Sequence, residues 1–167
     1  MKYISSIIMI AVMALASQNV AAKCSKAASE TIPFEQLVTM IATGSHWHEN
    51  NLAEAGLNKL YRDSYEEEFG EAVIFVYGNN AKAEVSDAWD VKLSSEGPHA
   101  YAIEVKLTTD NGTALYFKDK ADHDAFMDCL RQSSYYRQDE YDEIIGESLL
   151  EHDEYLNGWY VVKFHIG

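Results

Sequence analysis

Alternating apolar and polar positions predict strands through the middle of the chain. The pattern is clearest in residues 100–108, where one side of the alternation is apolar: Tyr101, Ile103, Val105 and Leu107. This period of two is typical of a strand with one buried face. Residues 72–77 (AVIFVY) form a continuous apolar run between Gly70 and Gly78, which predicts a more deeply buried strand. We expect further strands over residues 57–65, 82–85, 89–93, 113–117 and 159–166.

A second pattern, with apolar residues three and four positions apart, predicts two main helices. The first begins at Pro33, ends at Gly44 and has one apolar stripe: Phe34, Leu37, Val38 and Ile41. The second follows Asp119, a residue type favoured at helix N-caps, and has its own stripe: Ala125, Phe126, Cys129 and Leu130. A shorter helical segment is expected over residues 51–55.

The acidic segment 139–154 (DEYDEIIGESLLEHDE) holds eight carboxylates in 16 residues. Interpreted as a helix, it places Tyr141, Ile145 and Leu149 on one apolar face. Like charges four residues apart destabilise such a helix, and Gly146 weakens it by about 1 kcal/mol. A solvated helix face, a docking strip for a basic partner and a low-affinity Ca²⁺ site are the alternatives. The segment contains no EF-hand loop pattern.

The order of these elements predicts the fold class. A helix is followed by four or five strands, a second helix and a closing strand, and the Asn111-Gly112 pair predicts a tight hairpin between two of the strands. We therefore expect an α+β domain, with an antiparallel sheet of about five or six strands and two main helices packed on one face. This single domain is expected over residues 33–167, after a flexible lead at residues 23–32.

Residues 1–22 have the layout of a secretory signal peptide. A lysine at position 2 gives a positive start, residues 7–16 are an unbroken apolar run, and small residues stand before Lys23. The run is too short to span a bilayer, which needs about 20 apolar residues. We therefore expect cleavage near Ala22-Lys23 and a secreted or periplasmic location, with no membrane span.

The charge of the chain narrows the choice of partners. With 13 Lys and Arg against 27 Asp and Glu, the formal net charge is −14 at pH 7. Such a surface repels nucleic acids and anionic lipids and favours cationic partners. A basic protein or a glycan is therefore expected as a partner, and nucleic acid is not.

The two cysteines of the chain, Cys24 and Cys129, form a candidate disulfide. An exported protein meets an oxidising compartment in which such a bond persists. The alternative is that Cys129, on the apolar stripe of its helix, is a buried free thiol.

The segment Gly44–Glu49 contains the strongest metal-binding pattern. In an extended segment, His46 and His48 point to the same side and could share Zn²⁺ or Cu²⁺. A third ligand would come from elsewhere in the chain: Glu49, His99, His123, His152 or His165. The alternative is a solvated loop whose Trp47 folds onto the core. No other cofactor is expected.

Aromatic and acidic residues in the last third of the chain are candidates for a binding surface. Exposed tyrosines and tryptophans anchor protein partners or stack on sugar rings, whereas buried ones fill the space between sheet and helices. The candidate residues are Tyr135, Tyr136, Tyr155, Trp159, Glu143, Glu147 and Glu151.

Local catalytic motifs are missing from the sequence. It contains no G-x-S-x-G, H-E-x-x-H or S-x-x-K pattern and no glycine-rich phosphate loop. We therefore expect a non-catalytic binding or inhibitor-like module that uses an acidic, aromatic-rich surface. The alternative is an exported hydrolase or metal-binding protein that uses His46 and His48 with carboxylates.

Overall fold

A computed structural model describes residues 32–43, 49–67, 70–107 and 112–166 of the chain. The helices in these residues are α2 (Phe34–Ala42), α3 (Glu49–Glu54) and α4 (Lys120–Gln132). The first strands are β1 (Asn58–Glu67), β2 (Gly70–Asn79), β3 (Ala81–Val85), β4 (Val91–Ser95), β5 (Tyr101–Leu107) and β6 (Gly112–Phe117). The strands after α4 are β7 (Tyr136–Gln138), β8 (Glu143–Ile145), β9 (Ser148–Leu156) and β10 (Trp159–Ile166).

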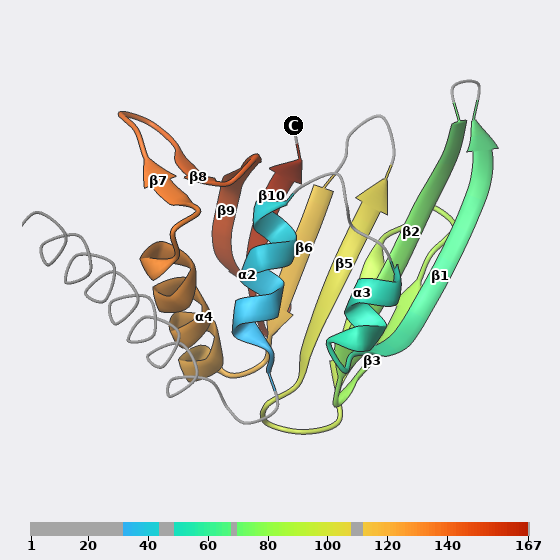
Figure 1. Cartoon of the computed structure of the whole chain (residues 1–167). Helices are drawn as coiled ribbons and strands as arrows, with labels where there is room; N and C mark the ends of the chain where they lie inside the picture. The colour runs from blue at the N-terminus through green and yellow to red at the C-terminus, as the bar shows by residue number, and fades with distance from the viewer. Residues whose placement is uncertain (1–31, 44–48, 68–69, 108–111, 167) are drawn as a thin grey trace, which may run out of the picture.

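One large antiparallel sheet dominates the molecule. Its eight strands lie in the order β1-β2-β5-β6-β10-β9-β8-β7, while β3 and β4 form a separate hairpin (Figure 1). Every pairing between neighbouring strands is antiparallel. The last strand, β10, is inserted beside β6 and so joins the two halves of the sheet.

The predicted fold class is therefore wrong. The expectation was an α+β domain with a sheet of about five or six strands and two main helices. The described chain is instead mostly strand, with eight strands in one sheet and two more in the hairpin. The error arises after α4, where β8 and most of β9 lie in the segment 139–154, which the sequence pattern allowed as an acidic helix.

The segment 139–154 forms strands and no helix because Gly146 lies in a tight turn between β8 and β9. Gly146 has a φ of +62°, and Ile145 pairs with Ser148 across the turn. A second tight turn, Asn157-Gly158, has φ values of +52° and +84° and connects β9 to β10. Two adjacent residues with positive φ are the geometry that Asn-Gly hairpins favour.

The main core lies between the sheet and the helices, which are in front of the sheet in Figure 1. Phe34 of α2 contacts Phe126 of α4 with ring centroids 5.9 Å apart, and both rings contact Phe117 of β6. The predicted capping of the second helix is confirmed, because the Asp119 carboxylate accepts a hydrogen bond from the backbone of Ala121 at 2.7 Å. No helix in the described residues is long and apolar enough to cross a membrane.

The opposite face of the sheet carries a second, smaller core. It consists of Ala81, Ala100, Ala114, Trp159 and Val161, with Leu60, Leu93 and Tyr116 packed against them. The β3–β4 hairpin covers part of this face, where the ring of Trp89 lies 4.9 Å from that of Tyr65. The alternation in β5 thus separates two environments, with Ile103 facing the helices and Glu104 the opposite side.

The β8–β9 turn lies directly against the end of α2. The hydroxyl of Ser148, fully buried, donates a hydrogen bond to the carbonyl oxygen of Ile41 at 2.8 Å. A Cβ atom on Gly146 would lie only 1.9 Å from the carbonyl oxygen of Ala42. Both the positive φ and this close approach therefore require glycine at position 146.

Replacement of Gly146 tests this packing. We expect Gly146→Ala to lower the free energy of unfolding by about 2–5 kcal/mol, because backbone strain and overpacking add together. Gly56→Ala is the matched control, since Gly56 has a φ of +83° but no atom within 4 Å of the added Cβ. That variant should lose only about 1–2 kcal/mol. Equal losses in urea unfolding of the two variants would contradict the close approach.

Candidate functional site

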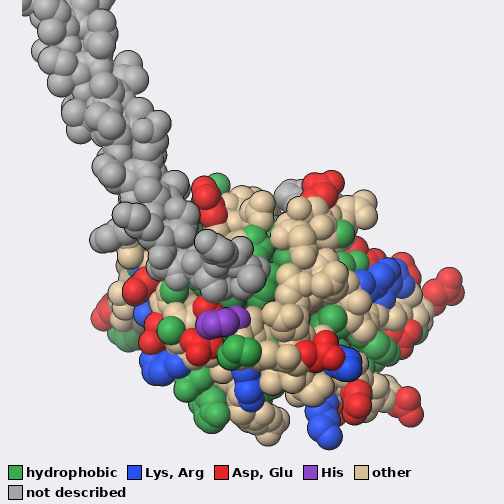
Figure 2. Space-filling view, turned by 90° about the horizontal axis from the view of Figure 1, so that it is seen from below, with side chains coloured by type: hydrophobic (Ala, Val, Ile, Leu, Met, Phe, Trp, Pro, Cys, Tyr) green, Lys and Arg blue, Asp and Glu red, His purple; other side chains and the backbone are tan. Residues whose placement is uncertain are grey.

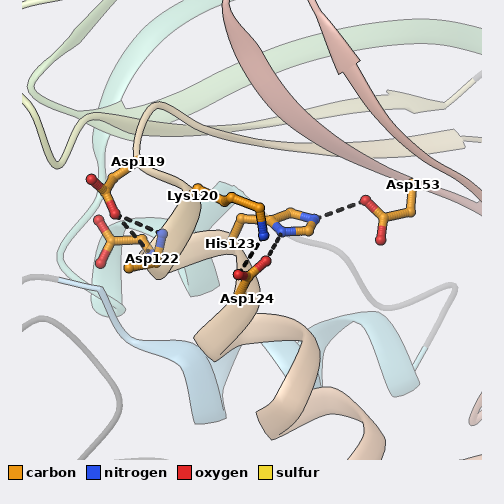
Figure 3. A network of polar contacts seen from close by, with 7 residues as sticks. Asp119, Lys120, Asp122, His123, Asp124 and Asp153 are labelled. Atoms are coloured by element: carbon orange, nitrogen blue, oxygen red, sulfur yellow. Dashed lines mark hydrogen bonds and ion pairs between the residues drawn. The ribbon is translucent and has the colours of Figure 1, made fainter.

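A cluster of titratable side chains lies at the N-terminal end of α4, and Figure 3 shows six of its members. We call it the α4-end cluster and define it as His99, Asp119, Lys120, Asp122, His123, Asp124 and Asp153. Four of its members lie in the first turns of α4 and one caps that helix. His99 precedes β5 and Asp153 lies in β9, so the fold brings together three separate segments. Figure 2 views this end of the molecule, where acidic and histidine side chains reach the surface.

His123 is held on both sides by carboxylates. Its side chain is 8% exposed, with Nδ1 3.0 Å from Asp124 Oδ1 and Nε2 2.8 Å from Asp153 Oδ1. Lys120 Nζ also donates a hydrogen bond to Asp124 at 2.6 Å. This bond and that from His123 lower the pKa of Asp124 below its usual value of 3.8. These two contacts hold the His123 ring between α4 and β9.

A column of rings connects His123 to the surface. The imidazole lies 5.6 Å from the ring of Tyr160, which in turn lies 4.7 Å from the ring of Tyr155. Tyr155 is 65% exposed. Asp153 is two residues before Tyr155 in β9, so the two side chains project from the same side of that strand. The result is an exposed aromatic ring that is packed from behind and has a carboxylate beside it.

His99 and Asp122 form the second polar contact of the cluster. His99 Nδ1 lies 2.9 Å from Asp122 Oδ2, and the side chains are 52% and 7% exposed respectively. The hydrogen bond to Asp122, and then its negative charge, raises the pKa of His99 above 6.5. Within the described residues, the hydrogen bonds of His99 and His123 go to carboxylates and not to a serine or cysteine nucleophile. His99 and His123 thus connect α4 to the segment before β5 and to β9.

The residues predicted for a binding surface are divided among several places. Tyr136 and Glu143 meet near the C-terminal end of α4, where the Tyr136 hydroxyl donates to Glu143 at 2.8 Å and Arg131 binds the same carboxylate at 2.9 Å. Tyr155 belongs to the surface of the α4-end cluster. The remaining positions are Tyr135, 44% exposed, and Glu147 and Glu151, both exposed.

The prediction that Trp159 belongs to an exposed binding surface is wrong. It is only 3% exposed and packs in the smaller core, where Lys118 Nζ lies 5.5 Å from the centre of its ring. Its strand alternation places it on the sheet face opposite the helices, beneath the region that the β3–β4 hairpin partly covers. Trp159 therefore stabilises the fold and offers no exposed ring to a partner.

Three predicted residues lie outside the described part of the chain: His46, His48 and Cys24. Their proposed roles in metal binding and in a disulfide remain predictions. Cys129, the other cysteine, is 4% exposed in α4, and no free cysteine is found among the described residues.

A second polar feature is a hollow of about 400 Å³ on the sheet face opposite the helices. Its lining includes Glu104, Lys106, Tyr116, Glu151 and Lys163. The Glu104 side chain is 7% exposed, lies 2.8 Å from Lys106 Nζ and accepts a hydrogen bond from the Tyr116 hydroxyl. Burial, together with the charge of Glu104, raises the pKa of Tyr116. Lys163 pairs with Glu154 at 2.6 Å, so these charges neutralise one another.

Local sequence signals could identify only part of the α4-end cluster. The run Asp119-Lys-Ala-Asp-His-Asp contains five titratable residues in six positions, and helical geometry alone brings them close together. His99 and Asp153 lie 23 and 30 residues from their partners in the sequence. Their contribution depends on strand pairing and could not be read from spacing.

Comparisons with protein-family models, with curated proteins and with solved structures find no match to this chain.

The Arg131–Glu143 contact predicts a pH-dependent stability. The hydrogen bond from Arg131 outweighs partial burial and lowers the pKa of Glu143 below 4.5. Its contribution is therefore present above pH 4.5 and is lost as the pH falls through the lower pKa of the folded state. We expect Glu143→Gln to lower the free energy of unfolding by about 1 kcal/mol near neutral pH. The difference from the unmodified protein should shrink below pH 4.5.

Urea unfolding over a pH series measures this effect. Glu147→Gln is the matched control, because Glu147 is an exposed turn residue, and it should change the free energy by less than about 0.5 kcal/mol at any pH. A Glu143→Gln deficit that stays constant with pH would show that the carboxylate charge is not what stabilises this contact.

Proposed function

We propose that this protein is a non-catalytic, exported binding module that engages a basic protein through the surface around Tyr155. The observation that carries the proposal is the exposed Tyr155 ring, packed against Tyr160 at 4.7 Å and next to Asp153. Rigid tyrosines are frequent anchors of protein interfaces because they bury a large area and lose little conformational entropy. We call the surface formed by Tyr155, Asp153 and Asp124 the Tyr155 surface.

Charge supports a cationic partner. The chain has a net charge of −14, and the carboxylates of Asp153 and Asp124 are 39% and 50% exposed next to the aromatic column. A Lys or Arg of a partner could pair with these carboxylates and also lie over the tyrosine ring. Such charge complementarity speeds association and suppresses binding to acidic surfaces. A glycan is the competing ligand, because an exposed tyrosine also stacks on sugar rings.

Export is the second part of the proposal. The three-part layout of residues 1–22 supports removal of a signal peptide before Lys23. In an oxidising compartment we expect Cys24 to pair with Cys129, and the lack of a free cysteine among the described residues supports this pairing. The alternative function, a hydrolase or metal-binding protein that uses His46 and His48, remains a prediction.

The export and disulfide predictions share one measurement. Intact mass spectrometry of the protein recovered from the exporting cells should give a chain that starts at Lys23. Thiol alkylation without reductant should add no label, whereas alkylation after reduction should add two. A chain that retains residues 1–22, or one that is labelled without reduction, would contradict the corresponding prediction.

Substitution of Tyr155 tests the binding surface. We expect the mature protein to bind a fluorescent lysine-rich peptide, and Tyr155→Ala to weaken this binding at least about tenfold, the loss typical of an interface anchor. Tyr141→Ala is the matched control: Tyr141 is 85% exposed and also has acidic neighbours, but it lies in the β7–β8 loop. This variant should bind as the unmodified protein does.

Salt separates the two ligand classes in the same assay. Binding through the carboxylates should weaken as ionic strength rises, because salt screens exposed charges. Equal loss in Tyr155→Ala and Tyr141→Ala, or no peptide binding at low salt, would overturn the proposed surface. Salt-independent binding of a neutral oligosaccharide that requires Tyr155 would replace the basic protein with a glycan.

A further inference from the structure

Three metal-ligating side chains meet at the outer edge of the α4-end cluster. His99, Asp119 and Asp122 each offer one ligand atom, and these atoms all lie within 4.8 Å of one another. His99 comes from the segment before β5, whereas the two aspartates belong to the cap and first turn of α4. We propose that this trio binds a divalent cation of the Zn²⁺ type, a role that goes beyond the proposed binding of a basic protein.

The burial of Asp122 is the first argument for a cation. Its side chain is 7% exposed, and a carboxylate withdrawn from water needs a compensating positive charge. Glu104 is equally buried and lies 2.8 Å from Lys106. Among the described residues, Asp122 has no Lys or Arg within 4.0 Å, and its ion-pair partner is His99. A bound cation would place a full positive charge beside this buried carboxylate.

The geometry leaves oxygen atoms available to a metal ion. One oxygen of Asp119, Oδ1, accepts hydrogen bonds from the backbone of Ala121 and Asp122 at 2.7 and 3.3 Å. A carboxylate has two oxygens that can accept, so this capping role leaves the second oxygen of Asp119 free to act as a ligand. The capping bonds also fix the orientation of the carboxylate, as outer hydrogen bonds do in metal sites.

The set of donor atoms selects the class of metal. One imidazole nitrogen and two carboxylate oxygens suit Zn²⁺, which often takes three protein ligands and a water molecule. Ca²⁺ takes six to eight oxygen ligands and is poorly matched by this trio. Two carboxylates also balance the double charge of the ion. His99 is 52% exposed, so a metal ion can reach the trio from solvent.

One electrostatic effect opposes the site. The N-terminus of α4 carries a partial positive charge of about +0.5, which repels a cation. Asp119 and Asp122 together contribute two negative charges at this end of the helix, so the local field still favours a cation. The opposing dipole makes the expected binding weaker than that of a closed four-ligand zinc site.

Zinc titration of the full chain, after treatment with a chelator, tests the proposal. We expect isothermal titration calorimetry to show one Zn²⁺ per chain and thermal unfolding to show a higher Tm in the presence of Zn²⁺. His99→Ala and Asp122→Asn should each weaken zinc binding at least tenfold and abolish the rise in Tm. His99→Ala changes an exposed side chain, so it keeps the test valid if Asp122→Asn does not fold.

Two controls separate this site from other histidines. His165→Ala removes a histidine that is 46% exposed and lies 3.8 Å from Glu151, and it should leave zinc binding unchanged. The double variant His46→Ala/His48→Ala should also bind zinc normally. Zinc binding that survives His99→Ala, that disappears in the double variant, or that never reaches one ion per chain would overturn the proposed site.

Discussion

The contact among three phenylalanine rings fixes the position of α4, and the candidate site depends on that position. Phe34, Phe117 and Phe126 meet pairwise with centroid distances of 5.2 to 6.2 Å, and each is at most 2% exposed. Aromatic pairs of this kind contribute about 0.5–1.5 kcal/mol each beyond the burial of their area. Phe117 ends β6 only two residues before the Asp119 cap. The strand end that anchors the rings therefore also sets the direction in which α4 leaves the sheet.

The helices and strands whose apolar residues follow only one period, either that of a helix or that of a strand, could be predicted from the sequence. The alternation in residues 100–108 corresponds to β5, and the predicted strand at residues 159–166 has the same bounds as β10. The segment 139–154 failed because Tyr141, Ile145 and Leu149 are four residues apart and fit a helix as well as a strand. The Asn157-Gly158 pair was the missed signal. It is as strong a hairpin signal as Asn111-Gly112, and it favours a strand on its N-terminal side.

The candidate site was predictable only where its residues are neighbours in sequence. Asp119 was expected to cap α4, and its capping hydrogen bonds are present. Tyr155 was among the expected aromatic residues, but its packing on Tyr160 depends on the β9–β10 register, in which the two residues are paired. Trp159 was expected on the binding surface for the same reason as Tyr155, namely that it is an aromatic residue in the last third of the chain, and yet it is buried. Whether an aromatic residue faces solvent depends on the face of the strand that carries it, and composition does not contain that information.

The strand order also leaves the large sheet with two edge strands, β1 and β7. An open sheet has two edges, and each exposes backbone groups that could pair with a strand of another molecule. The edge strand β7 has only three residues, which is too short to template an extended pairing. The other edge, β1, is ten residues long but carries both signs of charge along its length: Lys59, Arg62, Asp63 and Glu66. Short length at one edge and charge at the other are features by which natural sheets limit edge-to-edge pairing.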